Sequence, residues 1–174
     1  MTLRKPETTD ATYLADYWFG PQSSHLRASL DISMLGDRAS MLTRMQNVFA
    51  AMPEQGPWST LVGEIDGLPA GAVLINNLVP DQEALVHVHI WNPDHRRMGL
   101  ASSMAWDAFL YFLDSFSLKK LVMQIPVENL PVIELLKSLG LVPEGTFFGK
   151  AAPICNEGHY VRFSIDRSSL AGRT

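Results

Sequence analysis

Hydrophobic residues follow two different periods along this chain of 174 residues. In four segments they recur at helical spacing, which predicts helices at residues 10–19, 37–51, 100–116 and 129–140. In shorter segments they alternate or run together, which predicts strands at residues 2–5, 58–66, 70–79, 83–91, 119–127, 142–149 and 158–165. This order, with one strand–helix–strand crossover in its middle, predicts a mixed α/β (α+β) fold.

Polar residues and glycines mark the ends of several of these elements. Asp66-Gly67 is a hairpin signal between two expected strands. Asp37 and Asn129 stand where each can cap a helix, and Gly140 stands where a helix would end. Residues 22–36 show neither period and are expected to form a loop or a broken helix.

Composition limits the class of protein. Hydrophobic residues make up 47% of the chain, so we expect one domain over residues 1–166 and a C-terminal tail over 167–174. The net charge of −4 gives no excess of basic residues that would indicate binding of nucleic acid. Cys155 is the only cysteine, which excludes an internal disulfide and suits a reducing compartment. No stretch resembles a signal peptide or a membrane span, so we expect a cytoplasmic protein without a membrane partner.

The segment from Leu85 to Ala101 carries the most chemical information. A strand with His87 and His89 runs into a loop rich in hydrogen-bond donors, and the loop opens a helix at Arg96-x-x-Gly99-x-Ala101. Backbone N–H groups and the positive end of a helix then point to one place, which suits a pyrophosphate. A plain strand–turn–helix without a ligand is the alternative.

This segment resembles the acetyl-coenzyme A signature of the GNAT N-acetyltransferase superfamily, Arg/Gln-x-x-Gly-x-Gly/Ala after a strand. A second stretch is similar to the family pattern Asn-x-x-Ala-x-x-x-Tyr-x-x-x-Gly-Phe-x-x-Glu-Gly, at Asn129, Val132, Leu136, Gly140, Leu141, Glu144 and Gly145. The resemblance covers the whole chain in organisation and residues 83–147 in motif. It implies a GNAT-like acyl-coenzyme A N-acyltransferase fold, with a central, mostly antiparallel, twisted sheet and flanking helices.

The resemblance also implies where acetyl-coenzyme A, the co-substrate, would lie. Its pantetheine arm would occupy a gap between strands 85–91 and 121–127, and its pyrophosphate would lie on the loop that follows the first strand. The residues assigned to it in this way are His89, Ile90, Trp91, Arg96, Arg97, Met98, Gly99, Leu100, Ala101, Ser102, Asn129 and Lys137. Asn129 has the alternative of a helix cap, and Lys137 that of a solvated surface lysine.

Acyl transfer to an amine requires the amine to lose a proton, so the site needs a side chain that accepts this proton. Strand alternation places His87 and His89 on one face, opposite an apolar face of Val86, Val88 and Ile90. Imidazoles titrate near neutral pH and suit this role, and Glu83 is a carboxylate alternative. The His-x-His pair is similar to one in arylalkylamine N-acetyltransferases, where His87 holds the equivalent place. We find no third ligand that would indicate a metal site.

One position departs from the family pattern. Leu136 stands where many members have a tyrosine that protonates the departing thiolate. Leucine has no proton to donate, which leaves Ser138, Tyr160, a water molecule, or departure of the thiolate without assistance.

Together these features predict an N-acetyltransferase that moves an acetyl group from acetyl-coenzyme A to a primary amine, by direct attack in a ternary complex. A non-catalytic acyl-coenzyme A-binding module with the same fold is the alternative, favoured by Leu136. Residues 144–147 resemble the ribosomal-protein alanine acetyltransferases, which implies a protein N-terminus as acceptor, whereas the histidine pair implies a small amine. Residues 13–57 and 142–165 should wall the acceptor side, with Tyr17, Trp18 and Trp58 as candidates. The sequence does not decide between a monomer and a homodimer.

Overall fold

The computed structural model describes residues 1–23, 26, 30–51, 58–95 and 99–170. The strands are β1 (Thr2–Arg4), β2 (Ser59–Ile65), β3 (Leu68–Val79), β4 (Glu83–Ile90), β5 (Lys120–Pro126), β6 (Pro143–Gly149) and β7 (Gly158–Asp166). The α-helices are α1 (Asp10–Phe19), α3 (Arg38–Ala50), α4 (Leu100–Ser115), α5 (Leu130–Ser138) and α6 (Arg167–Leu170). Short 3-10 turns lie at Pro21–Ser23, Ile32–Leu35 and Pro93–His95. The predicted helices and strands are confirmed, with boundaries that differ by at most two residues.

Two details correct the expectations for the chain ends and the caps. Residues 167–170, expected in the tail, form α6, and Leu170 is buried in the main core. The side chain of Asp37 caps α3 by accepting a hydrogen bond from the Ser40 N–H at 2.7 Å. Asn129 holds the N-cap position of α5, but its side chain makes no capping hydrogen bond.

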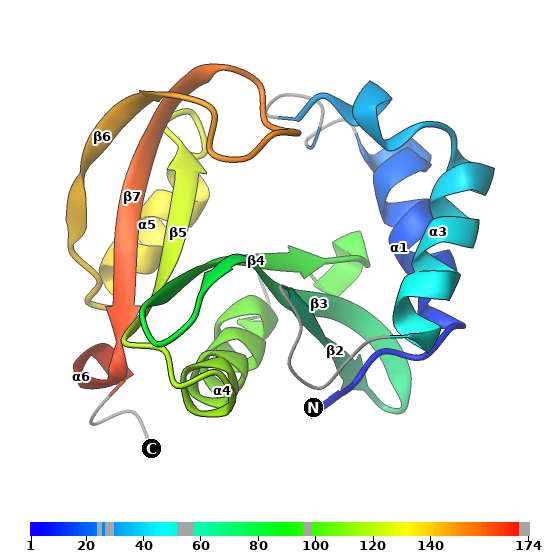
Figure 1. The fold of residues 1–174 in the computed structure, drawn as a ribbon, viewed down its shortest axis with the longest axis horizontal. Helices are drawn as coiled ribbons and strands as arrows, with labels where there is room; N and C mark the ends of the chain where they lie inside the picture. Colours follow the sequence, from blue (N-terminus) through cyan, green and yellow to red (C-terminus); the bar gives the residue numbers. More distant parts are fainter. Residues whose placement is uncertain (24–25, 27–29, 52–57, 96–98, 171–174) are drawn as a thin grey trace.

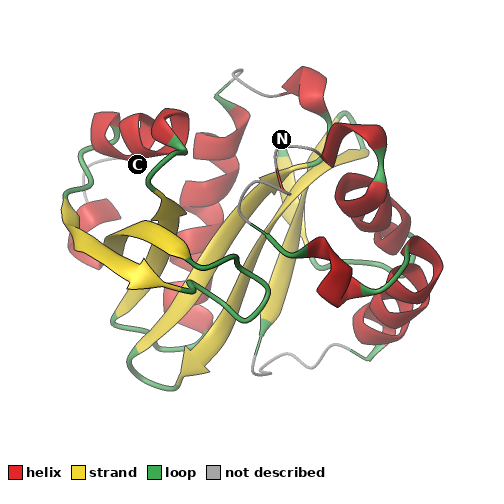
Figure 2. Ribbon diagram, turned by 90° about the horizontal axis from the view of Figure 1, so that it is seen from above, coloured by secondary structure: helices red, strands yellow, loops and turns green. Residues whose placement is uncertain are grey.

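The strands form one sheet in the order β1-β2-β3-β4-β5-β7-β6, and helices flank it (Figures 1 and 2). Every neighbouring pair is antiparallel except β4 and β5, which are parallel because α4 crosses between them. α1 and α3 cover one face at Val62, Ala72 and Trp91, and α4 and α5 pack in the core of the other face. The predicted mostly antiparallel sheet with flanking helices is confirmed.

The parallel pair parts after only a few residues. β4 pairs with β5 from Glu83↔Lys120 to Leu85↔Val122, and no described residue of β4 beyond Leu85 pairs with β5. β4 nevertheless continues to Ile90 along β3, and β5 continues to Pro126 along β7. The two strands therefore diverge inside a continuous sheet, as Figure 1 shows.

A second junction lies across the divergence. Leu30 forms an isolated antiparallel bridge with Cys155, and the Asp31 N–H donates to the Ile154 carbonyl at 2.8 Å. The segment after α1 thus meets the loop between β6 and β7 (Figure 1). The expectation of irregular structure over residues 22–36 is confirmed for the part that the structure describes. Besides the sheet, this bridge thus links segments on the two sides of the divergence.

Candidate active site

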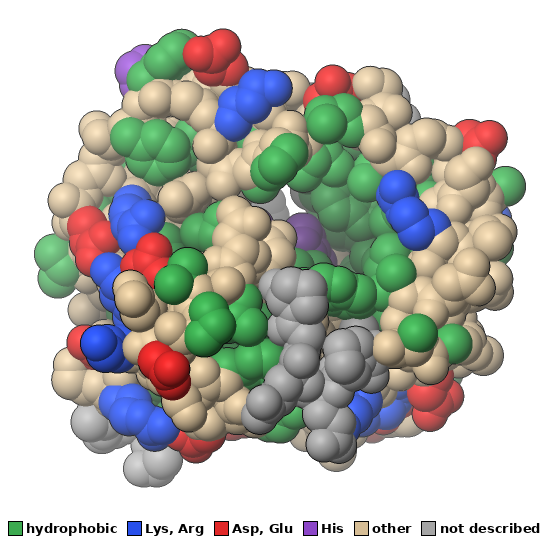
Figure 3. Space-filling view, viewed as in Figure 1, with side chains coloured by type: hydrophobic (Ala, Val, Ile, Leu, Met, Phe, Trp, Pro, Cys, Tyr) green, Lys and Arg blue, Asp and Glu red, His purple; other side chains and the backbone are tan. Residues whose placement is uncertain are grey.

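A cavity of about 330 Å³ lies where β4 and β5 part. On one side it is lined by the apolar face of β4 and by side chains of α4 and α5: Val86, Val88, Ile90, Ala105, Phe109, Val132, Leu135 and Leu136. On the other side it is lined by the histidine face of β4, by α1 and by the bridged segments: His87, His89, Tyr17, Leu26, Leu30, Ala151, Cys155 and Tyr160. Because the sheet is open here, one cavity has walls from both faces. Figure 3 shows the surface hollowed at this place, with hydrophobic and histidine side chains inside.

His87 has an unusual environment for a titratable side chain. Its Nε2 is buried and has no hydrogen-bond partner. Burial lowers the pKa of the imidazole from 6.5 to about 4, so the ring is neutral at physiological pH. A buried polar atom without a partner costs free energy, and such an atom in a cavity wall is suited to accept a hydrogen bond from a bound molecule.

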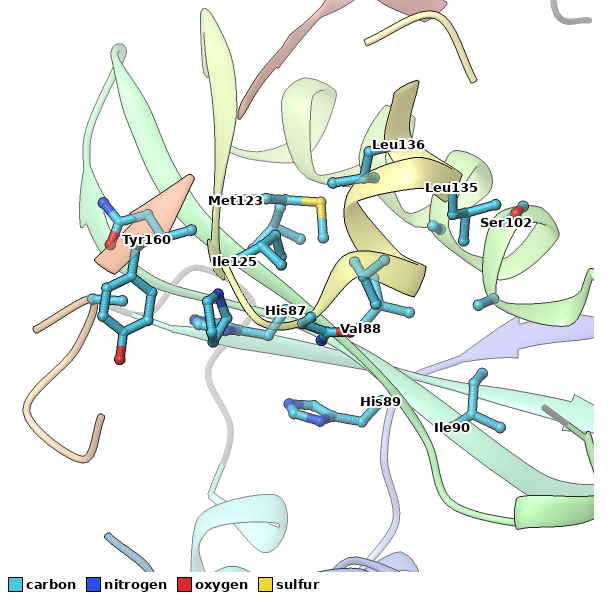
Figure 4. A pocket seen from close by; sticks show the side chains of 18 of the residues that line it. His87, Val88, His89, Ile90, Ser102, Met123, Ile125, Leu135, Leu136 and Tyr160 are labelled. Carbon is cyan, nitrogen blue, oxygen red and sulfur yellow. The ribbon is translucent and has the colours of Figure 1, made fainter. Parts of the chain in front are cut away.

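His89 belongs to an aromatic cluster on the same face. Its Nδ1 lies 3.1 Å from the Tyr17 hydroxyl, and its ring centroid lies 5.8 Å from that of Trp18. The rings of His87 and His89 lie nearly parallel, with centroids 6.4 Å apart. Figure 4 shows His89 on the side of β4 away from Leu135 and Leu136, whereas Val88 points toward them. The alternation predicted for this strand is confirmed.

Glu83 lies at the opposite end of β4 and is not among the residues that line the cavity. Its carboxylate contacts Lys120 Nζ and an Arg162 guanidinium nitrogen, each at 3.2 Å. Burial raises the pKa of this carboxyl, but hydrogen bonds from Lys120 and Arg162 outweigh that effect and hold the pKa below its ordinary value. Glu83 is thus an ion-pair partner of Lys120 and Arg162 and does not line the cavity, whereas His87 and His89 do.

Comparison with known proteins places this arrangement in a family. The family model of the acetyltransferase (GNAT) domain matches residues 1–142. The chain belongs to the GNAT acetyltransferases. An uncharacterised N-acetyltransferase p20 of Bacillus licheniformis is 26% identical over 149 residues, which covers 83% of this chain and 80% of that protein.

Solved structures of the spermidine N-acetyltransferase SpeG from Vibrio cholerae share the fold. One SpeG variant has a TM-score of 0.75 at 19% identity and covers 99% of both chains. SpeG in complex with manganese ions has a TM-score of 0.72 at 18% identity, covering 99% of this chain and 96% of its own. These neighbours support the architecture derived above.

In this GNAT chain, the residues expected to hold acetyl-coenzyme A fall into four groups. His89, Ile90, Ala101, Ser102 and Asn129 line the cavity. Gly99, at the start of α4, adopts the left-handed conformation with φ of 75°, and a Cβ there would meet no atom within 4 Å. Arg96, Arg97 and Met98 lie outside the described residues, and of Leu100 the structure gives only its place as the first residue of α4.

Two other members of that set lie elsewhere. The Trp91 N–H donates to the Ala70 carbonyl at 2.9 Å, and the Trp91 side chain is buried against α1, with its ring stacked on Tyr13. Lys137 is exposed and pairs with Glu134 at 2.9 Å, one turn away on α5. Neither residue lines the cavity. Lys137 is a solvated surface lysine, which is the alternative that the sequence offered for it.

The position of Leu136 bears on the leaving group. Leu136 is buried in the cavity wall. The Ser138 hydroxyl donates to the Leu135 carbonyl at 2.8 Å on the exposed side of α5, whereas Tyr160 lines the cavity and donates to the Asn156 carbonyl at 2.6 Å. Burial and the neighbouring Cys155 raise the pKa of Tyr160 to about 12, so its hydroxyl keeps its proton. Of the two side chains suggested from the sequence, only Tyr160 reaches the cavity.

Sequence reasoning missed part of the acceptor side. Leu26 and Leu30 line the cavity although the segment around them has no regular period. Cys155, for which the sequence indicated only the absence of an internal disulfide, lines it as well. Tyr17 lines the cavity as expected, but Trp58 does not. Contacts between segments more than a hundred residues apart leave no local signal.

Two further findings concern metals and membranes. Among the described residues, no group of three or more His, Cys, Asp or Glu side chains is placed to hold a metal ion. No helix in the described part of the chain has the length and apolar character to cross a bilayer.

Proposed function

We propose that this GNAT chain transfers an acetyl group from acetyl-coenzyme A to a small primary amine. The observation that carries the proposal is the cavity at the β4–β5 divergence, which joins a wall on the α4–α5 face of the sheet to a wall bearing His87 on the other face. A donor on one side and an amine on the other would meet at the open edge of β4. Amine acetylation by the structurally similar SpeG agrees with this choice of acceptor class.

Several features of the chain fit the cofactor. The edge of β4 beyond Leu85 faces the cavity instead of β5, so an extended amide chain can lie beside it as a further strand. Ser102 and Ala101, in the first turn of α4, line the same cavity, and a helix N-terminus stabilises anionic groups. When bound, acetyl-coenzyme A would supply the activated acetyl group.

His87 is proposed to accept the proton of the amine. An ammonium has no lone pair, so the proton must leave before the nitrogen forms its bond to the acetyl carbon and the carbon–sulfur bond breaks. The imidazole is already neutral at physiological pH, since burial lowers its pKa to about 4, and its Nε2 has no partner inside the protein. Tyr160 is the proposed proton donor to the departing thiolate, because it lines the cavity and its hydroxyl stays protonated. Its hydroxyl would exchange the hydrogen bond to the Asn156 carbonyl for one to the sulfur.

The test is amine-dependent release of free thiol from acetyl-coenzyme A, followed with a thiol reagent. His87→Gln should lower kcat about 100-fold and leave the Kd of acetyl-coenzyme A within about twofold, since removing a general base costs typically a hundredfold or more. Tyr160→Phe should lower kcat about tenfold with the same unchanged Kd. The matched control is His159→Gln, which changes an exposed histidine on β7. Its kcat and its Kd for acetyl-coenzyme A should equal those of the unmodified chain.

Two results would contradict the proposal. One is tight binding of acetyl-coenzyme A with no thiol release in the presence of any amine, which would support the non-catalytic module. The other is full turnover by folded His87→Gln protein, which would remove His87 from the mechanism.

A further inference from the structure

The part of the cavity beyond the histidines has a wall of its own, here called the acceptor wall: Tyr17, Leu26, Leu30, Ala151, Cys155 and Tyr160. Its residues come from α1, from the segment after α1, from the β6–β7 loop and from β7. The Leu30–Cys155 bridge joins the two middle segments. Tyr17, Leu26, Cys155 and Tyr160 are all buried. A ligand that extends past His87 must therefore contact this wall.

The polar atoms of the acceptor wall are engaged within the protein. The Tyr17 hydroxyl lies 3.1 Å from His89 Nδ1, and the Tyr160 hydroxyl donates to the Asn156 carbonyl at 2.6 Å. Burial raises the pKa of the Cys155 thiol, which keeps it neutral. Apart from the Tyr160 hydroxyl, the acceptor wall thus presents aromatic and aliphatic carbon to the cavity. Among the described residues that line the whole cavity, none is Asp or Glu.

We infer that the acceptor is a primary monoamine with an apolar alkyl or aryl body, an inference that rests on the proposed function and names its substrate class. Carbon surface gains free energy when it is buried against carbon surface. A second ammonium group on the substrate would instead lose its hydration beside Leu26 and Leu30 without a carboxylate partner, which is unfavourable. The wall therefore favours an apolar tail and disfavours a polyamine.

A series of straight-chain amines tests the inference on the unmodified protein. From propylamine to hexylamine, kcat/KM for thiol release should rise about threefold for each added methylene until the cavity is filled, as burial of a methylene group predicts. Spermidine should have a kcat/KM at least about 100-fold below that of hexylamine. A flat series, or spermidine turned over as well as hexylamine, would overturn the inference and leave the proposed function standing. No turnover with any of these amines would contradict the proposed function, and the inference with it.

A pair of variants locates the effect at the acceptor wall. Leu30→Asp places a carboxylate in the wall and should reduce kcat/KM for hexylamine at least about tenfold. The ratio of kcat/KM for hexylamine to that for spermidine should become smaller. Met34→Asp is the matched control, since Met34 is 54% exposed a few residues further along the same segment, and it should keep the preference of the unmodified protein. Thermal melting confirms that both variants are folded. A folded Leu30→Asp protein with an unchanged preference would contradict the role of the wall.

Discussion

At the scale of single residues, the site depends on two titratable side chains, those of His87 and Tyr160. His87 is neutral because burial lowers its pKa, and its Nε2 has no partner within the described residues, so this atom can accept a hydrogen bond from a bound amine. Tyr160 is kept protonated by its surroundings and can supply a proton.

The buried His87 also predicts a dependence of stability on pH. Its pKa is about 4 in the folded chain against 6.5 for an ordinary histidine, so the unfolded chain binds more protons below pH 6.5. Stability therefore falls as the pH falls from 6.5 towards 4. Between pH 7 and pH 5, this one group should lower the free energy of unfolding by about 2 kcal/mol. Urea unfolding at the two pH values measures the change.

The control variants separate this effect from other titrations. His87→Gln should lose most of the difference between pH 7 and pH 5, because glutamine does not titrate. His159→Gln, which changes an exposed histidine, should keep the difference of the unmodified chain. An equal pH dependence in the His87→Gln protein and in the unmodified protein would show that His87 is not buried in its neutral form.

At the scale of elements, the site depends on the pairing of β4 with β3 beyond the point where β5 diverges from β4. Gly71 lies opposite Ile90 in the β3–β4 register, at the end of β4 that forms the cavity edge. A Cβ at Gly71 would overlap the His89 carbonyl oxygen and crowd Met104 of α4. The absence of a side chain at Gly71 thus allows the strand pair and α4 to pack closely beneath the site.

Gly71→Ala should therefore lower the free energy of unfolding by about 1–3 kcal/mol, as overpacking of a tight site does. Because the overlap includes the backbone of β4, the variant should also weaken binding of acetyl-coenzyme A. The matched control is Gly158→Ala, where a Cβ would meet Tyr160 at an ordinary 3.9 Å, and its stability should change by less than about 0.5 kcal/mol. Chemical denaturation and a binding titration give both quantities, and equal effects of the two variants would contradict the close packing at Gly71.

At the scale of the whole molecule, local patterns and long-range contacts contributed different parts of the picture. Hydrophobic periodicity and turn residues predicted the helices and strands, and strand alternation predicted the face shared by His87 and His89. Neither could place Leu30 against Cys155, because that bridge joins segments that are irregular and distant in sequence. The ion pairs of Glu83 could not be predicted for a similar reason, since its partners Lys120 and Arg162 lie on other strands.

The bridge makes the molecule a closed frame around one cavity (Figures 1 and 3). Donor and acceptor would enter this frame from opposite faces of the sheet and meet where β4 and β5 part. That meeting point is the central claim of the account, and it requires the donor thioester to lie next to His87.

A crystal structure of the complex with coenzyme A and hexylamine tests this claim most directly. The account predicts the pantetheine arm between β4 and β5 beyond Leu85 and Val122, the amine nitrogen within about 3.5 Å of His87 Nε2, and the alkyl chain against Leu26 and Leu30. Coenzyme A bound outside the β4–β5 divergence, or an amine nitrogen remote from His87, would contradict it.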